Sequence, residues 1–182
     1  QATYTDDIAE LQGTLHAALG LSQKPHARIT AMDLSAVRAA RGVVAVYTAQ
    51  DIPGTNDCGP IIHDDPILAA ELVQYVGQPI FIVVAETHDH ARRAVRLAQV
   101  SYDELPAIMT PQAAMAAQSY VLPPMRLARG DYQAAFEQAP HVVKGQLYVG
   151  GQEQFYLEGQ ISYAIPKEAQ GMLVLCSTQH PS

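Results

Sequence analysis

The stretch "IFIVVAETHDHARRAVRLAQVSYDEL", residues 80–105, decides the fold class because strand and helix periodicities follow one another within it. Ile80 to Ala85 is a nearly continuous apolar run, which predicts a strand buried on both faces. Thr87 is suited to cap a helix, and small apolar residues then recur at i, i+3, i+4 and i+7. They are Ala91, Ala94, Val95 and Ala98. Val100 to Leu105 predicts a second strand, so we expect an α+β fold with this helix lying close against a sheet.

The residues before this stretch predict three more strands and a short helix. The expected strands are Leu15–Ser22, Ala27–Leu34 and Val43–Thr48. Ser35 is suited to cap a helix over Ala36–Arg41, and Gly42 stands where a left-handed residue ends a helix. Residues 53–66 hold three prolines, two glycines and three aspartates, which predicts a loop.

The residues after Leu105 predict a linker and the beginning of a second domain. Residues 106–128 contain four prolines around a short Ala-rich piece with room for one or two helical turns. Asp131 is expected to cap a helix that ends before Pro140, with one face made by Tyr132, Ala135, Phe136 and Ala139. Three strands are expected afterwards, at 141–149, 160–166 and 172–178. The last runs into Gln179–Ser182 without a further element, which we interpret as a truncated second domain.

Composition and charge exclude several classes of function. The 182 residues carry a formal net charge of −7, so no broad basic surface is expected and neither nucleic acid nor an anionic membrane is a suitable partner. Arg92, Arg93 and Arg96 form the one basic cluster, which is typical of a solvated helix face. No apolar run reaches the length of a membrane span. The N-terminus lacks an initiator Met and the features of a signal peptide, so we expect a chain that begins within a longer protein.

The two cysteines and seven histidines do not predict a metal site. Cys58 and Cys176 lie far apart with no CxxC pattern, which favours reduced thiols in a cytoplasmic protein and leaves a single disulfide open. His88 and His90 would point to different sides of a helix. His63-Asp64-Asp65 is more typical of a solvated turn than of a cation site. Because the sequence has no dinucleotide, P-loop or nucleophile-elbow motif, we expect any nucleotide, flavin or iron–sulfur cluster to lie outside this chain.

One segment concentrates polar and aromatic groups, namely "GGQEQFYLEGQ", residues 150–160. Gly150 and Gly151 permit a positive φ or the close approach of another surface. Gln152 then offers both a donor and an acceptor without charge. If the segment is a strand, Gln152, Gln154 and Tyr156 point to the same side. The residues alone leave two interpretations open, a glycine bulge over a satisfied core and an amide directed at a ligand.

The sequence resembles the molybdenum hydroxylase (xanthine oxidase) family over essentially its whole length, in the form of the bacterial large subunit of the xanthine dehydrogenase type. The resemblance rests on "GGQEQFYLEGQISYAIPKE", "MLVLCSTQHPS", "PHARITAMDLSAVRAARGVVAVYTAQDIPGTND", "YVGQPIFIVVAETHDHARRAV" and "GDYQAAFEQAPHVVKGQLYVGGQ", in family order. It implies an α/β hammerhead domain over residues 1–107, a linker over 108–128 and the truncated start of a molybdopterin-binding domain over 129–182.

The resemblance also implies a function. Members of the family oxidise hypoxanthine and xanthine to urate at a molybdenum–molybdopterin cofactor, and electrons leave through 2Fe–2S clusters and FAD to NAD. The glutamine of the family's "GGQE" motif corresponds to Gln152, so it is expected near molybdenum, hydrogen bonded to an oxo ligand. The family's base and its purine-orienting residues belong to later stretches, so we expect no catalytic residue and no direct metal ligand here. The implied partners are the remainder of the molybdenum subunit, the iron–sulfur and FAD domains or subunit, and the purine; the isolated chain should lack the cofactor and be inactive.

Two alternatives stay open beside this interpretation. The first is a part of an aldehyde oxidase-type molybdenum hydroxylase, which the form of "GGQEQFYLE" disfavours. The second is a non-catalytic scaffold, a hammerhead domain that docks onto iron–sulfur and cofactor domains. A purine-orienting arginine and a glutamate base downstream of these residues would favour the enzyme over the scaffold.

Overall fold

A computed structural model describes residues 3–178, which separate into two compact units. One unit is Leu11–Val121, and the other combines described residues 3–10 with 122–178. The helices and strands of the first are β1 (His16–Leu21), β2 (Ala27–Asp33), α1 (Ser35–Arg38), β3 (Val43–Thr48), β4 (Leu72–Val73), β5 (Pro79–Ala85), α2 (His88–Val95), β6 (Gln99–Glu104) and α3 (Pro111–Ala116), with the 3-10 turn η2 (Ala49–Asp51). The mixed content agrees with the predicted α+β class.

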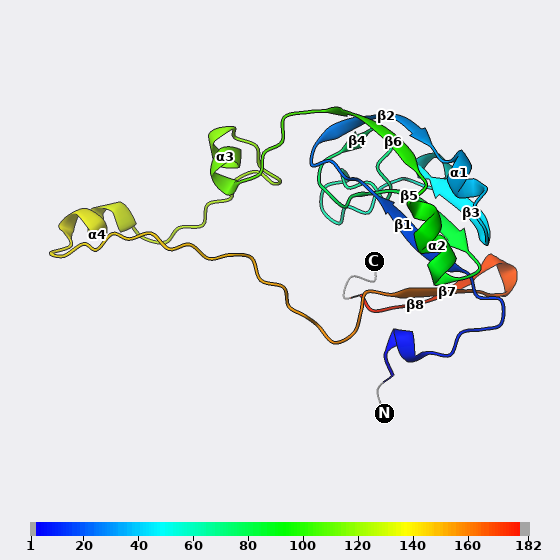
Figure 1. Cartoon of the computed structure of the whole chain (residues 1–182). Helices are drawn as coiled ribbons and strands as arrows, with labels where there is room; N and C mark the ends of the chain where they lie inside the picture. The colour runs from blue at the N-terminus through cyan, green and yellow to red at the C-terminus, as the bar shows by residue number, and fades with distance from the viewer. Residues whose placement is uncertain (1–2, 179–182) are drawn as a thin grey trace. The chain divides into compact units, whose positions relative to one another are not determined.

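The first sheet of this unit has the strand order β1-β5-β3, with β5 antiparallel to both neighbours. The helix α2 packs against β1 and β5, as Figure 1 shows for this unit. Phe81, Val83 and Ala85 on alternate positions of β5 are at most 2% exposed, whereas Ile82 and Val84 on the opposite face are half-buried. The prediction of a buried strand is therefore confirmed fully for one face of β5 and partly for the other.

The helix α2 meets its sheet through the predicted small residues. Thr87 caps it by accepting a hydrogen bond from the His90 amide at 3.2 Å, as predicted. Ala91 and Ala94 are 0% and 1% exposed, and Val95 and Ala98 are partly buried. Because alanine adds little bulk between a helix and a sheet, the backbone of α2 lies close to the strands, and its charged residues face solvent.

The second sheet has the order β4-β2-β6, again antiparallel. The register between β2 and β6 shifts between Ile29 and Ala31, which explains why apolar residues do not alternate cleanly in the β2 sequence. A core cluster contributed by both sheets and by α1 and α2 joins them. Its members are Ala27, Leu34, Val37, Val46, Ala69, Val73, Ile80, Phe81, Val83 and Ala94. The short strand β4 was not predicted, because two residues carry no periodicity.

The helix α1 is shorter than predicted and begins differently. Ser35 is its first helical residue rather than its cap, so that prediction was wrong. The reason is Asp33, whose carboxylate accepts a hydrogen bond from the Ser35 amide at 2.9 Å and so satisfies the helix N-terminus from outside. The helix ends at Arg38 instead of Arg41. Gly42 has φ +76, as predicted for a left-handed position, and it leads directly into β3.

Replacing Gly42 with alanine is expected to destabilise this unit by about 2–4 kcal/mol. The new Cβ would be strained by the positive φ and would overlap the imidazole of His90, whose Nδ1 is buried without a hydrogen-bond partner among residues 3–178. Urea unfolding followed by far-UV circular dichroism measures the change.

A matched control for this substitution is Gly13→Ala. Gly13 also has a positive φ, of 84°, but a Cβ there meets nothing within 4 Å. Gly13→Ala should therefore lose only the stability that corresponds to the backbone strain. Equal losses of stability in the two variants would contradict the packing of His90 on Gly42.

The second unit contains η1 (Thr5–Asp7), α4 (Tyr132–Gln138), β7 (Ser162–Pro166), η3 (Glu168–Gln170) and β8 (Met172–Cys176). Asp131 caps α4 as predicted, accepting hydrogen bonds from the amides of Gln133 and Ala134 at 3.1 and 3.0 Å. The predicted apolar face of α4 has no cover among the described residues, since Tyr132 and Phe136 are more than half exposed.

The strands of the second unit are fewer than predicted. β7 and β8 pair as an antiparallel hairpin within the predicted ranges 160–166 and 172–178. The predicted strand at 141–149 is not formed, and Val143, Leu147 and Tyr148 there are 85% to 96% exposed. No described strand pairs with that segment. The prediction concerning Gln179–Ser182 lies outside the described residues. Within residues 3–178, no helix has both the length and the apolar character needed to cross a membrane.

Candidate functional site

The segment 150–160 has no regular secondary structure apart from a bend near Leu157 and Glu158. Gly150 and Gly151 do not have a positive φ, which leaves the close approach of another surface as the remaining alternative, and a Cβ at either position would meet nothing within 4 Å. The left-handed residue of the segment is instead Phe155, with φ 50. The backbone on the N-terminal side of Gln152 is therefore open to the approach of another group.

Gln152 is exposed on this open backbone. Among the described residues its side chain makes no hydrogen bond, and its carboxamide keeps both donor and acceptor capacity. The neighbouring Glu153 bends back, with its Oε1 accepting a hydrogen bond from the Phe155 amide at 3.4 Å. The first of the two interpretations of this segment, a glycine bulge over a satisfied core, does not apply here, because none of the described residues of this unit, 3–10 and 122–178, is buried.

A hollow of about 730 Å³ lies next to the segment, within the same unit. Even-numbered side chains of the segment line it together with the start of β7 and the end of β8. They are Gln154, Tyr156, Glu158 and Gln160. The expected alternation is thus kept by Gln154 and Tyr156, but Gln152 is not part of the lining.

Ser177 holds the far end of the segment in place. Its hydroxyl donates a hydrogen bond to the Gly159 carbonyl at 2.8 Å and accepts one from the Ile161 amide at 3.1 Å. Glu158 is anchored as well, because its Oε1 accepts a hydrogen bond from the Thr5 amide at 2.8 Å. Sequence reasoning missed both roles, since a single serine or glutamate has no recognisable spacing. Gln152 therefore lies toward the end of the segment that these contacts do not hold.

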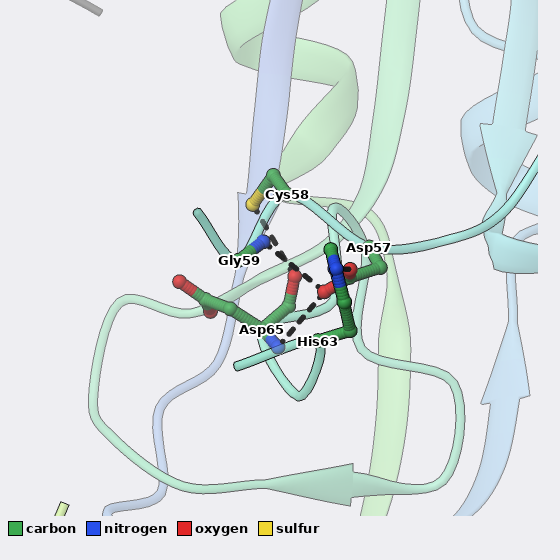
Figure 2. Close-up of polar contacts among 5 residues, drawn as sticks. All are labelled: Asp57, Cys58, Gly59, His63 and Asp65. Atoms are coloured by element: carbon green, nitrogen blue, oxygen red, sulfur yellow. Dashed lines mark hydrogen bonds and ion pairs between the residues drawn. The ribbon is translucent and has the colours of Figure 1, made fainter. Parts of the chain in front are cut away.

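The loop 53–66 of the first unit holds the other concentration of polar side chains, and Figure 2 shows five of its residues. Asp57 is its centre. The carboxylate of Asp57 accepts hydrogen bonds from the amides of Gly59 at 3.1 Å and Asp65 at 3.2 Å, and its Oδ2 lies 2.7 Å from Nδ1 of His63. Because three donors occupy the two oxygens, this acid serves as an anchor for the loop.

The same contacts shift the pKa values of Asp57 and Cys58 in this loop. The hydrogen bond from the Gly59 amide lowers the pKa of Asp57 below its ordinary value, burial opposes the shift, and His63 and the Asp65 amide add to it. Burial raises the pKa of the Cys58 thiol, and the negative charges of Asp65 and Asp57 raise it further. Cys58 also donates a hydrogen bond from Sγ to the Asp65 carbonyl at 3.3 Å. A thiol in these surroundings is not an activated nucleophile.

Asp57→Asn is expected to speed amide hydrogen exchange at Gly59 and Asp65, because the neutral amide loses the charge-assisted hydrogen bonds. The pH dependence has a definite sign. Since the folded pKa of Asp57 is depressed, its contribution is present above the ordinary aspartate pKa of about 3.9 and is lost as the pH falls through the folded pKa. Exchange measured by NMR at neutral pH tests the substitution. Asp64→Asn on the same loop is the control, and equal acceleration by both variants would contradict the role of Asp57.

Cysteines, histidines and carboxylates are not gathered into a metal site in the described part of the chain. Within residues 3–178 no three His, Cys, Asp or Glu side chains form a group able to hold a metal ion. Cys58 and Cys176 are both free thiols and both exposed. The open possibility of one disulfide is thereby resolved for this structure.

Comparison with protein families identifies the chain. Residues 1–106 match the family described as "Aldehyde oxidase and xanthine dehydrogenase, a/b hammerhead domain". The chain belongs to this family. Residues 112–182 match a second description, "Molybdopterin cofactor-binding domain", and include Gln152 and the hollow beside it. The expected fold, a hammerhead domain followed by the start of a molybdopterin-binding domain, is confirmed.

Relatives and solved structures agree with membership of the family. The xanthine dehydrogenase of Dictyostelium discoideum is 39% identical over 182 residues, which is 100% of this chain and 13% of that protein. The structure of quinoline 2-oxidoreductase from Pseudomonas putida 86 has a TM-score of 0.84 at 28% identity, covering 98% of this chain and 25% of the other. The aldehyde oxidoreductase from Desulfovibrio gigas has a TM-score of 0.82 at 28% identity, covering 97% and 22%. The family members are therefore oxidoreductases much longer than these 182 residues.

Proposed function

We propose that these residues are part of a molybdenum hydroxylase that oxidises hypoxanthine and xanthine to urate in the cytoplasm. The observation that carries the proposal is the 39% identity to a xanthine dehydrogenase over all 182 residues, including both domains. We further propose that residues 1–107 form the hammerhead domain, residues 108–128 a linker, and residues 129–182 part of a molybdopterin-binding domain. Electrons would leave through 2Fe–2S clusters and FAD, on other domains or another subunit, to NAD.

The residues present fit a molybdenum–molybdopterin cofactor as a supporting surface. Gln152 has an exposed carboxamide with no partner among the described residues, and the adjoining glycines leave open space for a bulky group. When bound, the cofactor supplies the redox centre that takes electrons from the substrate. We assign to Gln152 the task of donating a hydrogen bond from Nε2 to an oxygen of that centre. An uncharged donor stabilises negative charge there without adding a proton that the chemistry would remove.

The purine specificity is supported by the sequence relatives, because the xanthine dehydrogenase of Dictyostelium discoideum is 39% identical over all 182 residues. An aldehyde oxidase-type enzyme is the alternative, favoured by the close structural match to the aldehyde oxidoreductase of Desulfovibrio gigas. A scaffold role fits less well, because the match to the cofactor-binding description extends over the segment that holds Gln152.

The experiment is a substrate comparison on the protein made from the complete reading frame that contains these residues, produced with its partner chains and molybdate. Xanthine, hypoxanthine and benzaldehyde are offered separately, and NAD reduction and urate formation are recorded. We expect both purines to reduce NAD and to yield urate, with a kcat/KM well above that for benzaldehyde. Oxidation of benzaldehyde without oxidation of either purine would replace the proposal with the aldehyde-type alternative. Turnover of none of the three by a molybdenum-loaded preparation would contradict both.

A further inference from the structure

The exposed side of α2 carries a row of basic side chains that the proposed function does not use. His88, Arg92 and Arg96 are spaced at i, i+4 and i+8, which places them on one face of the helix. All three are exposed, while Ala91 and Ala94 on the opposite face are buried against the sheet. We call His88, Arg92 and Arg96 the basic row. The packing of the alanines fixes the rotation of α2, so the row faces solvent.

Only some of the arginines on this helix form ion pairs. Arg93 is neutralised by Asp89, with Nε 2.9 Å from a carboxylate oxygen one turn earlier. Arg92 and Arg96 lie one turn apart, and neither has an ion pair among the described residues. Two like charges at i and i+4 repel each other and destabilise a helix. A cation near the helix C-terminus interacts favourably with the helix dipole, but one residue would be enough for that.

The basic row borders a hollow of about 530 Å³, lined by its three members with Asp89 and Arg93. The chain as a whole is acidic, with 18 Asp and Glu against 11 Lys and Arg. Arg92 and Arg96 are two cations without an ion pair among the described residues, and on an acidic chain they are complementary to negative charge on a partner. Guanidinium groups bind carboxylates with two parallel hydrogen bonds, and the spacing of one turn suits two successive carboxylates.

We propose that the basic row is a docking surface for a carboxylate-rich protein segment. The net charge of −7 favours this partner over a nucleic acid, because a duplex would bring its phosphates against the rest of an acidic surface. The row contacts such a segment through Arg92 and Arg96, and His88 extends the contact by one turn. This inference does not depend on the proposed enzymatic activity.

The test uses the full chain and a fluorescein-labelled oligoglutamate peptide, with binding followed by fluorescence anisotropy at low ionic strength. We expect saturable binding that weakens as salt approaches about 0.15 M, where the Debye length falls to roughly 8 Å. Arg92→Gln with Arg96→Gln should weaken binding by about tenfold or more, because two charge-assisted contacts are lost. Far-UV circular dichroism checks that each variant is folded.

The matched control removes the same charge from sites outside the hollow. Arg28→Gln with Arg129→Gln also removes two guanidinium groups, both exposed and neither in the lining of the hollow. This variant should bind the peptide within a factor of about two of the wild type. Equal weakening in both double variants, no saturable binding, or binding of inorganic polyphosphate without binding of oligoglutamate would each overturn the proposal.

Discussion

Phe81→Ala is expected to lower the free energy of unfolding of the Leu11–Val121 unit by about 3–5 kcal/mol. Phe81 is 2% exposed at the centre of β5, and its ring lies directly over Gly20 of β1, where a Cβ would overlap it. The glycine and the ring form one packed pair between neighbouring strands, so removing the ring leaves a cavity. A domain of this size has about 5–15 kcal/mol in total, so a substantial share of that free energy would be lost.

Urea unfolding followed by far-UV circular dichroism measures the loss in Phe81→Ala. Phe155→Ala removes the same ring from a position that is 93% exposed, and it should change the unfolding free energy by less than about 0.5 kcal/mol. A loss of under about 1 kcal/mol in Phe81→Ala would contradict the description of the core around β5.

Gln152→Ala in the complete enzyme is expected to lower kcat by about a hundredfold or more, with little change in molybdenum content. The reason is the assigned hydrogen bond, which an alanine cannot donate. Gln152→Glu keeps the shape of the side chain but replaces the donor with a carboxylate, so it should lose activity as well. Steady-state kinetics with xanthine, together with metal analysis of each variant, measures the effect.

The control for this substitution is Gln133→Ala, on the exposed side of α4 in the same unit. It removes an identical carboxamide from a place outside the candidate site, and kcat should stay within a factor of about two of the wild type. A Gln152→Ala enzyme with full molybdenum and wild-type kcat would refute the assignment. Loss of molybdenum in that variant would instead give Gln152 a role in cofactor retention.

Sequence reasoning located the elements whose periodicity was strong. The strand β3 matches its predicted bounds, β5 lies within one residue of its own, and α2 begins directly after its predicted cap Thr87. A continuous apolar run is typical of a buried strand, and small residues at helical spacing are typical of a helix that packs on a sheet. Thr87 and Asp131 were recognised as caps because each precedes a helical pattern and has a short polar side chain.

The failures have physical causes of their own. Residues 141–149 have the composition of a strand, but β-propensity describes a fit to a paired surface, and no described strand supplies one. Ser35 was a reasonable cap by residue type. Asp33 accepts a hydrogen bond from the Ser35 amide, because its carboxylate reaches the helix start from the preceding strand, and Ser35 is then the first helical residue. Which of two neighbouring polar residues lies outside the helix is decided by backbone geometry that the sequence does not specify.

The candidate site depended on two kinds of information. Residue chemistry identified 150–160 as unusual but left a structural and a ligand-binding interpretation open. Gln154 and Tyr156 line a common hollow, although the segment is not the strand from which a shared side was expected and Gln152 is not in the lining, and the roles of Ser177 and Glu158 came from tertiary contacts alone. The assignment of Gln152 rests on the family motif, because an exposed glutamine has no distinctive spacing or burial.

The most direct test of the central claim is metal analysis of the protein produced from the complete reading frame that contains these residues. The cells are grown in tungsten-free medium supplied with molybdate. A part of a molybdenum hydroxylase predicts about one molybdenum per polypeptide, released together with its pterin on denaturation. Tightly folded protein with less than about a tenth of an equivalent of molybdenum and no pterin fluorescence after denaturation would contradict the account.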